Sequence, residues 1–591
     1  MCGIFAYIGG DNRAVRKAIQ GLKDLEYRGY DSWGVAVKTP RGIESRKGVG
    51  KVSDIDERDF NDISGTISLG HTRWATHGKV CIENSHPHFN TDKTIAVVHN
   101  GIIENYRELR DDIGAHLFRS ETDTEVIPHL IDSFMRRGFS FEKAFLKTCK
   151  MLKGRFAFVA LQADSSFILS ARNGSPLVVG KGEGEYFIAS DTPAFLDYTS
   201  TVNYMHDGEY VKITPSSIQF FDFKTGKEMR KKDEEVAWGK LDASKGGWDH
   251  FMLKEIMEQR ESLGRVLAEE AETIARAVRI IKKAKNIFLV ACGTAGYASM
   301  VAERALSEIA GVKARFVPAS EFRAFLPFVD SRTVVIPVTQ SGETADVLEA
   351  IKESRQKKAK IVSVINVRGS SVERESDAAL PINAGPEKAV ASTKAATSQI
   401  LMFLLLAHAL SGHEMRGRKI LKKAVRDIGK WLEEKRLRDI RQIAERVVSA
   451  PNLFVIGKGM LYPVALEAAL KIKEVSYIHA EGFAAGELKH GPIALIEQGT
   501  PCIALLGDDE NTNDVLNGVE ELKARGAFII GIAPQEQKSD VFDAWIPVPD
   551  SGIASALTHL IPTQILAYYL AVLRGNNPDK PRNLAKSVTV K

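Results

Sequence analysis

Two short stretches of this chain combine glycine with Ser and Thr hydroxyls, a composition suited to holding a phosphate. CGTAGYAS (292–299) follows the apolar run NIFLVA, and TQSGETADV (339–347) follows TVVIPV. Each stretch lies where a predicted strand ends and a helix begins, and free backbone N–H groups and the helix dipole favour an anion there. Glycine also lets the backbone approach a ligand closely. The expected contributors are Gly293, Thr294, Thr339, Ser341, Gly342 and Thr344.

Such residues also cap helices, so one loop of this kind alone would indicate only a helix start. Two loops on successive strands of one parallel sheet favour a ligand, because the carboxyl ends of the strands meet at one edge. No G-x-G-x-x-G and no Walker A motif follows either strand. We therefore expect a phosphorylated ligand that is not a nucleotide. A third hydroxyl-rich stretch, ASTKAAT (391–397), precedes an apolar helix expected over 398–410.

The N-terminal part carries a second set of polar groups, in GHTRWATHG (70–78), VHNGIIENY (98–106) and SETDTEVI (120–127). The histidines from His71 to His88 suggest zinc, but their spacings match no standard ligand framework, so we predict no metal. Asn100-Gly101 between apolar runs is also an ordinary hairpin signal. At this point the turn and a functional role both remain open for this dipeptide.

Composition narrows the class of protein. The chain has 591 residues, 44% hydrophobic and 26% charged, with a net charge of +5. This length requires several domains. The sequence has no basic block with interleaved aromatic residues, so nucleic acid is not an expected partner. The longest apolar stretches, 400–410 and 560–573, are too short to span a bilayer, so we predict buried helices and no membrane partner. Five scattered cysteines predict no disulfide framework and a reducing, cytoplasmic location.

The order of predicted elements divides the chain. Residues 1–230 alternate short strands with two helical stretches, which indicates an α+β layered domain. A polar stretch, 231–247, is expected to be a linker. Beyond it the chain repeats itself: the strand-turn-helix pattern from Asn286 recurs from Asn452, and the strand from Arg332 recurs from Gly499. A duplicated α/β unit with parallel sheets explains this, over 248–430 and 431–580, followed by a tail at 581–591.

These motifs together resemble one known family. Cys2-Gly3-Ile4, YRGYDSWG (27–34) and the three N-terminal stretches above resemble the glutaminase domain of class II amidotransferases. CGT, TQSGETADV, VASTKA, EVSYIHAEGFAAGELKHGP (474–492) and PRNLAKSVTV (581–590) resemble the glucosamine-6-phosphate synthases, and the resemblance runs over essentially the whole chain. It implies an αββα domain of the N-terminal-nucleophile type followed by two α/β parallel-sheet sugar-isomerase domains. It also implies transfer of ammonia from glutamine to fructose 6-phosphate, no cofactor, and a homodimer.

The resemblance assigns roles around glutamine. With the initiator methionine removed, Cys2 carries a thiol and a free α-amino group, whose ordinary pKa of about 7.7–8.0 suits a local base. Cys2 would attack the carboxamide, while the Asn100 side chain and the Gly101 N–H would stabilise the oxyanion. Arg73 and Asp123 match positions that hold the α-carboxylate and α-amino group. The same segments contain Trp74, Thr76, His77 and His86.

On the sugar side, the resemblance makes Glu474 the proton-shuttling base and gives Lys586 and His490 roles in ring opening, with the histidine supplied by a neighbouring subunit. Without the resemblance, the preferred interpretation of Glu474 is a solvated face of a helix expected over 464–476, because Lys471 and Lys473 flank it. The expected sugar-phosphate contacts are Gly293, Thr294, Thr339, Gln340, Ser341, Thr344, Val390, Ser392 and Lys471.

Two positions depart from the family pattern, Ala295 and Thr339, where serine is usual. A lost hydroxyl removes a hydrogen bond of about 1 kcal/mol, so affinity for the sugar could drop without a change of substrate class. An amidotransferase acting on phosphoribosyl pyrophosphate would need an acidic, glycine-bearing loop, which this sequence lacks. A phosphosugar-binding regulator without catalysis would not need Cys2, Asn100, Glu474 and Lys586, all of which are present.

Overall fold

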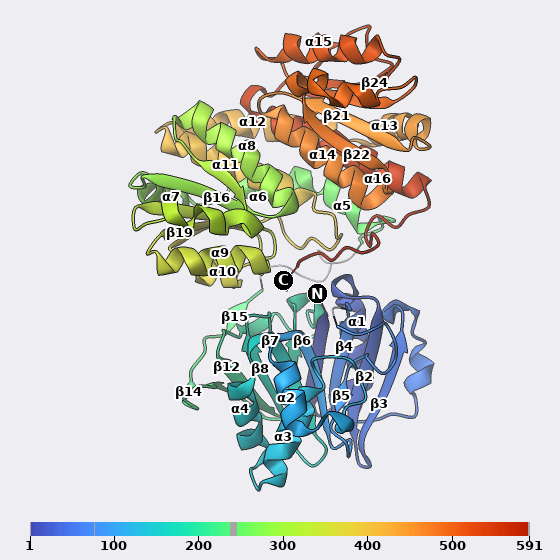
Figure 1. The fold of residues 1–591 in the computed structure, drawn as a ribbon, viewed down its shortest axis with the longest axis vertical. Coiled ribbons are helices and arrows are strands. Elements are labelled where there is room, and N and C mark those ends of the chain that lie inside the picture. The colour runs from blue at the N-terminus through green and yellow to red at the C-terminus, as the bar shows by residue number, and fades with distance from the viewer. Residues whose placement is uncertain (1, 76, 237–244, 589–591) are drawn as a thin grey trace. The chain divides into compact units, whose positions relative to one another are not determined.

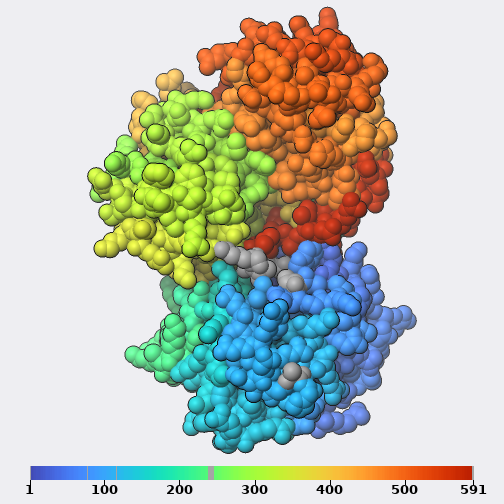
Figure 2. All heavy atoms as spheres, in the orientation of Figure 1, coloured from blue at the N-terminus to red at the C-terminus, as the bar shows by residue number. Residues whose placement is uncertain are grey.

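The computed structural model describes residues 2–75, 77–236 and 245–588. The chain divides into two compact units, one of residues 1–243 with 585–591 and one of residues 244–584 (Figure 1). Figure 2 shows the heavy atoms of both units as spheres. Each unit is described by itself below.

The first unit is built around two antiparallel sheets (Figure 1). One has the order β15-β11-β9-β10-β1-β4-β2-β3, and the other β14-β13-β12-β8-β7-β6-β5. The strands of the first sheet are β1 (Gly3–Gly9), β2 (Ser32–Thr39), β3 (Gly42–Val49), β4 (Ile67–Arg73), β9 (Val178–Lys181), β10 (Glu185–Ala189), β11 (Thr201–Tyr204) and β15 (Glu234–Glu235). Those of the second are β5 (His88–Phe89), β6 (Ile95–Ile103), β7 (Gly154–Gln162), β8 (Ile168–Asn173), β12 (Glu209–Thr214), β13 (Ser217–Asp222) and β14 (Glu228–Met229).

The layers of this unit follow from side chains that alternate along buried strands. In β1, Ile4 and Ala6 face the core between the two sheets, whereas Phe5 and Tyr7 face the core beneath helix α1 (Ala14–Asp24). The outer face of the second sheet is covered by three helices, α2 (Tyr106–Ile113), α3 (Val126–Arg136) and α4 (Phe141–Met151). The arrangement is helix, sheet, sheet, helix, so the predicted αββα domain is confirmed.

The second unit contains two five-stranded parallel sheets with the same topology. Their orders are β17-β16-β18-β19-β20 and β22-β21-β23-β24-β25. The first comprises β16 (Asn286–Ala291), β17 (Arg315–Pro318), β18 (Thr333–Thr339), β19 (Lys360–Ile365) and β20 (Ala378–Pro381). The second comprises β21 (Asn452–Gly457), β22 (His479–Ala484), β23 (Pro501–Leu505), β24 (Phe528–Ala533) and β25 (Ala544–Pro547). The identical strand order bears out the duplication inferred from the sequence repeat.

Helices connect and cover these sheets (Figure 1). They are α5 (Phe251–Met257), α6 (Gln259–Leu267), α7 (Ala271–Ile281), α8 (Gly293–Ala310), α9 (Ala345–Gln356), α10 (Ser371–Arg374), α11 (Lys394–Leu410), α12 (Glu414–Trp431), α13 (Glu434–Val447), α14 (Leu461–Ser476), α15 (Thr512–Lys523) and α16 (Ser555–Leu573). Buried residues of both repeats join in one continuous hydrophobic core that includes α8, α11, α14 and α16. The two repeats therefore stabilise each other.

The apolar helices need one correction. The stretch at 560–573 belongs to a helical segment, Gly552–Leu573, of 22 residues, which is long and apolar enough to cross a membrane by length and composition. The length argument made from the sequence was therefore wrong. Burial decides the matter instead, because 83% of its most apolar window lies inside the protein. Together with the buried α11, it forms core helices, as predicted.

Candidate active sites

The Cys2 thiol lies directly before β1, against the backbone that follows β4. The Trp74 amide nitrogen is 3.2 Å from Cys2 Sγ, and the thiol is 3.5 Å from the Trp74 carbonyl oxygen. The antiparallel pairing of β1 with β4, in which Gly3 faces Thr72, produces this contact. Burial raises the pKa of the Cys2 thiol, and the hydrogen bond from Trp74 and the charge of Arg73 act in the opposite direction. A raised pKa means that the thiol needs a base to become a nucleophile.

Asn100 and Gly101 lie inside β6, so the interpretation of this dipeptide as a hairpin turn is wrong. The Asn100 side-chain Nδ2 donates to the Cys2 carbonyl at 2.8 Å. Gly101 has a φ of +123°, and a Cβ there would lie 2.0 Å from the Arg155 carbonyl oxygen. Only glycine fits at this position without moving the neighbouring strand. The hydrogen bond to Cys2 and the close packing of Gly101 against Arg155 together hold the Asn100 amide beside Cys2.

Arg73 is buried, with 3% of its surface exposed, and organises the loop that follows β4. Its guanidinium donates to the carbonyls of His77, of Gly78 at 3.2 Å and of Lys79 at 3.0 Å. Asp31 accepts the Ala75 N–H at 2.9 Å and closes the other side of the same loop. Thr76 lies outside the described residues. The binding of a carboxylate by Arg73 stays a prediction.

Asp123 is buried at the end of the segment that precedes α3. Its carboxylate accepts the Ile103 N–H at 2.7 Å, which ties this segment to β6. Glu125 organises the same segment, because its carboxylate accepts the Ser120 N–H at 2.7 Å and that of Arg119 at 3.0 Å. Burial alone would raise the pKa of Glu125, but hydrogen bonds outweigh it and lower the pKa to about 2. The SETDTE motif is thus a folded support for Asp123.

Four buried histidines line the same region. The His71 and His86 rings stack with centroids 3.8 Å apart, and the His86 and His88 rings meet edge to face at 4.7 Å. The His99 N–H donates to His86 Nδ1 at 3.2 Å. His77 lies outside this stack, with its ring 5.8 Å from that of Tyr106. Among the residues that the structure describes, no three His, Cys, Asp or Glu side chains are placed to hold a metal ion.

Sequence reasoning passed over two residues of this region. Asp31 lies within the family motif YRGYDSWG, and His71 lies within GHTRWATHG, where its only suggested role was as one of the histidines that could bind zinc. Their places within these two motifs were the available signal. Their function depends on what they contact across the sheet, and a single sequence does not carry that information.

The two hydroxyl-rich loops of the second unit lie at adjacent strand ends, as predicted. β16 and β18 are parallel neighbours, and each loop follows the carboxyl end of its strand. Gly293 opens α8 with a φ of +54°, and Gly342 has a φ of +66°. A Cβ on Gly342 would lie 2.1 Å from the Ser370 Oγ, so glycine is required for this turn to pack.

The second loop holds its own shape through short-range hydrogen bonds. Thr339 Oγ1 accepts the Gly342 N–H at 3.1 Å, and Ser341 Oγ accepts the Glu343 N–H at 3.2 Å. Thr344 Oγ1 lies 3.4 Å from that of Thr339. The carbonyl of Gln340 accepts the Val367 N–H at 3.2 Å. The loop is therefore preorganised, which lowers the entropy lost on binding a ligand.

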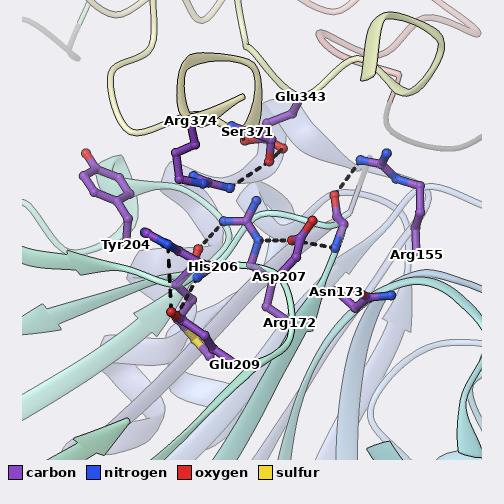
Figure 3. Close-up of polar contacts among 12 residues, drawn as sticks. Arg155, Arg172, Asn173, Tyr204, His206, Asp207, Glu209, Glu343, Ser371 and Arg374 are labelled. Carbon is purple, nitrogen blue, oxygen red and sulfur yellow. Dashed lines mark hydrogen bonds and ion pairs between the residues drawn. The ribbon is translucent and has the colours of Figure 1, made fainter. Parts of the chain in front are cut away.

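Glu343 fastens this loop to the neighbouring segment (Figure 3). Its carboxylate accepts the Ser371 N–H at 2.7 Å and the Ser371 hydroxyl at 2.8 Å. Arg374 in turn donates to the Ser371 Oγ at 2.9 Å. In the third stretch, the Val390 N–H donates to the Asp579 carbonyl at 3.0 Å and Ser392 donates to Glu387 at 2.9 Å. Each predicted sugar-phosphate loop is thus anchored by a buried carboxylate or a backbone contact.

Glu474 belongs to a buried ion cluster on α14 rather than to a solvated helix face. The Lys471 ammonium contacts the Glu474 carboxylate and lies 3.5 Å from Glu467 Oε1. Lys471 and Glu467 expose only 1% and 3% of their side chains, and Glu474 exposes 21%. Thr294 at the start of α8 donates to Glu467 at 3.1 Å. The cluster therefore joins the first sugar-phosphate loop to the helix that carries the predicted base.

The Lys471 ammonium lies between the carboxylates of Glu467 and Glu474. Burial and the neighbouring charges together set the pKa values of Glu467 and Lys471. Burial raises the pKa of Glu467 to about 7. Burial lowers the pKa of Lys471, but Glu467 and Glu474 outweigh it, so the net pKa of Lys471 is raised. Lys471 therefore stays charged between the two carboxylates.

The other two predicted sugar-site residues are placed differently. His490 is exposed at the end of the 3₁₀ helix Ala485–His490. Lys586 lies in the segment Ala585–Lys591, which groups with the first unit rather than with the two parallel-sheet repeats. The catalytic roles of both residues stay predictions.

Comparison with known proteins agrees with this architecture. A family profile of the glutamine amidotransferase domain matches residues 71–197, and a profile of the SIS domain matches residues 280–409 and 447–574. The chain is 42% identical, over 100% of both chains, to the glutamine–fructose-6-phosphate aminotransferases [isomerizing] of Thermococcus kodakarensis and Methanothermobacter thermautotrophicus.

A solved structure supports the same relationship. The C-terminal domain of glucosamine-fructose-6-phosphate aminotransferase from Francisella tularensis matches 57% of this chain and 100% of its own, with 33% identity and a TM-score of 0.53. Because the relatives match along their full length and both domain types lie in the same order, this chain belongs to the glutamine–fructose-6-phosphate aminotransferase (isomerizing) family.

Proposed function

We propose that this protein hydrolyses glutamine at Cys2 and transfers the ammonia to fructose 6-phosphate, which it isomerises to glucosamine 6-phosphate. The observation that carries the proposal is the placement of Cys2 beside the Asn100 amide, with Nδ2 2.8 Å from the Cys2 carbonyl. A thiol next to a fixed amide donor suits acyl transfer, because the donor can stabilise an oxyanion. Family membership supplies the substrates.

In the first half-reaction, removal of Met1 frees the α-amino group of Cys2, which takes the thiol proton. The thiolate attacks the carboxamide carbon of glutamine, and the carbonyl oxygen becomes an oxyanion held by the Asn100 Nδ2 and the Gly101 N–H. The C–N bond then breaks, and the nitrogen leaves as ammonia with the proton returned by the amine. Water hydrolyses the remaining glutamyl thioester to glutamate and the free thiol.

In the second half-reaction, ammonia adds to the C2 carbonyl of open-chain fructose 6-phosphate, and water leaves. Glu474 removes a proton from C1 and returns one to C2, and the proton of the C1 hydroxyl passes to the nitrogen, which leaves an aldehyde at C1 and an amine at C2. The Lys471 ammonium contacts the Glu474 carboxylate and holds it in position. Lys586 and His490 assist ring opening.

Three wider features belong to this proposal. We propose domain limits of 1–230, 248–430 and 431–580, with a linker at 231–247, of which Glu234–Glu235 pairs with the first sheet, and a tail at 581–591. The protein works in the cytoplasm as a homodimer in which His490 serves the partner's sugar site. The exposure of His490, and of Leu495 at 54%, supports a partner at this surface.

The test is a paired assay on the full chain, with glutamate and glucosamine 6-phosphate quantified in one reaction. Equal amounts of both products support the proposal, and glutamate without amino sugar contradicts it. For the dimer, His490→Ala and Glu474→Gln variants are each expected to be inactive as synthases. A mixture of the two variants, unfolded and refolded together, should recover synthase activity. Some dimers then contain one sugar site in which Glu474 and the partner's His490 are both intact. No recovery would contradict the shared site.

A further inference from the structure

We propose that His71 is a positioning residue for glutamine hydrolysis, which orients the Asn100 amide so that its N–H faces the oxyanion. The proposal rests on the function proposed above for Cys2 and Asn100. His71 lies in β4, with no exposed surface. Its Nε2 contacts the His99 carbonyl oxygen and Asn100 Oδ1, and it acts through Asn100.

The hydrogen bonds of His71 define its tautomer. His71 Nε2 lies 2.9 Å from the His99 carbonyl oxygen and 3.1 Å from Asn100 Oδ1. A carbonyl oxygen only accepts, so Nε2 carries the proton and donates to both oxygens. Burial lowers the pKa of His71 to about 3, which keeps the ring neutral with a single N–H. His71 is therefore a one-directional donor toward Asn100.

This donor fixes which way the Asn100 amide points. Nδ2 donates to the Cys2 carbonyl at 2.8 Å while Oδ1 accepts from His71. If the Asn100 amide were flipped, its Oδ1 would face the Cys2 carbonyl oxygen and its Nδ2 would face the His71 N–H. Both contacts would then be repulsive. Only the observed orientation leaves the second Nδ2 proton of Asn100 for the oxyanion. Without His71, Asn100 Oδ1 loses its donor in a buried site and the amide can turn.

The surroundings hold the His71 ring in place. Its face stacks on the His86 ring at 3.8 Å with 11° between the planes, and His86 is itself held by the His99 N–H at 3.2 Å. His71 Nδ1 has no hydrogen-bond partner among the described residues, although it is buried. A buried nitrogen without a partner is costly, and a leucine would avoid that cost. The donor on the other nitrogen, Nε2, is what a histidine offers at this position and a leucine does not.

The test uses full-length protein with His71→Leu, which removes the donor, and His71→Gln, whose amide can replace it. We expect kcat for glutamate release to fall ~30-fold in His71→Leu, with KM within about twofold, because a misoriented oxyanion donor affects the transition state. His71→Gln should recover most of the loss. The His408→Leu variant is a matched control, because His408 is a buried histidine of α11 and has no proposed role at the glutamine site. It should stay within about threefold of the unmodified protein.

Two further measurements separate positioning from damage to the fold. Iodoacetamide alkylates Cys2 without forming an oxyanion, so its rate in His71→Leu should match that of the unmodified protein. Glutamate γ-semialdehyde forms a tetrahedral adduct with the thiol, so its affinity should fall with kcat. In a double variant with Asn100→Ala, the loss should equal that of Asn100→Ala alone. The proposal would be overturned if the losses of His71→Leu and Asn100→Ala multiplied in the double variant. Slower alkylation of Cys2 in His71→Leu would also overturn it. If the unmodified protein released no glutamate, the proposed function itself would fail instead.

Discussion

The amide nitrogen of Trp74 lies 3.2 Å from the sulfur of Cys2, although 72 positions separate the two residues in the chain. The contact exists because β1 and β4 are antiparallel neighbours whose ends meet at the same edge of the sheet. The nucleophile is therefore held by backbone geometry, which a side-chain substitution at Cys2 leaves in place.

Replacement of Cys2 by alanine should abolish glutamate release and glutamine-dependent amino-sugar formation, because no other group at this position can form the thioester. Binding of fructose 6-phosphate should stay within about twofold, since its proposed loops belong to the other unit. Product quantification and sugar titration check both statements. Cys81→Ala is the control, and glutamate release at a normal rate by Cys2→Ala would show that another nucleophile acts.

Replacement of Ser341 by alanine should weaken binding of fructose 6-phosphate by roughly tenfold, because a hydrogen bond to a charged group is lost. Binding of unphosphorylated fructose should change much less. Calorimetric titration with both sugars measures the difference. Gly342 would be a poor control because its turn requires glycine, so Ser376→Ala, which changes a hydroxyl that donates to the Val372 carbonyl, serves instead. An equal loss for both sugars would mean that the loop recognises something other than phosphate.

Deletion of residues 582–591 should remove amino-sugar formation while substantial glutamine hydrolysis remains, because the tail carries the proposed sugar-site Lys586. Lys586→Ala should reproduce most of that loss. Val588→Ala is the matched control, since Val588 is 55% exposed. Glutamate and glucosamine 6-phosphate are measured in one reaction. Undiminished amino-sugar synthesis by the truncated protein would leave Lys586 without a catalytic role.

Replacement of Glu467 by glutamine should change how stability depends on pH. The folded pKa of Glu467 is raised to about 7 from an ordinary value of 4.5, so its stabilising contribution is complete below pH 4.5 and is lost as pH rises through 7. The loss is of the order of 3 kcal/mol, at 1.36 kcal/mol per unit of pKa.

Thermal unfolding of the full chain at pH 5 and pH 8 tests this expectation. The unfolding midpoint of Glu467→Gln is expressed as its difference from that of the unmodified protein. This difference should be more favourable to the variant at pH 8 than at pH 5, because glutamine carries no ionisable group. Glu481→Gln is the control, as Glu481 is part-exposed and pairs with His479 at the surface. Parallel pH dependence of Glu467→Gln and the unmodified protein would show that Glu467 is ionised throughout.

Much of this protein followed from its sequence. The stretches at 292–299 and 339–347 marked strand-to-helix turns because glycine readily allows a positive φ and a close backbone approach, and Ser and Thr hydroxyls suit a helix start. The repeat at Asn286 and Asn452 indicated a duplicated parallel sheet, because the strand-turn-helix order recurs with the same spacing. These features are local or periodic, so one chain is enough to reveal them.

Other features depended on contacts between distant segments. The sequence allowed Asn100-Gly101 to be a turn, and only the pairing of β6 with β7 places it inside a strand beside Cys2. It allowed Glu474 to be solvated, and only the packing of α14 against α8 encloses Lys471 and Glu467 and links them to Thr294. The apolar run at 560–573 was classified by its length, whereas burial in a shared core explains it. Burial and hydrogen-bond partners are properties of the assembled core, and residue types and spacing do not specify them.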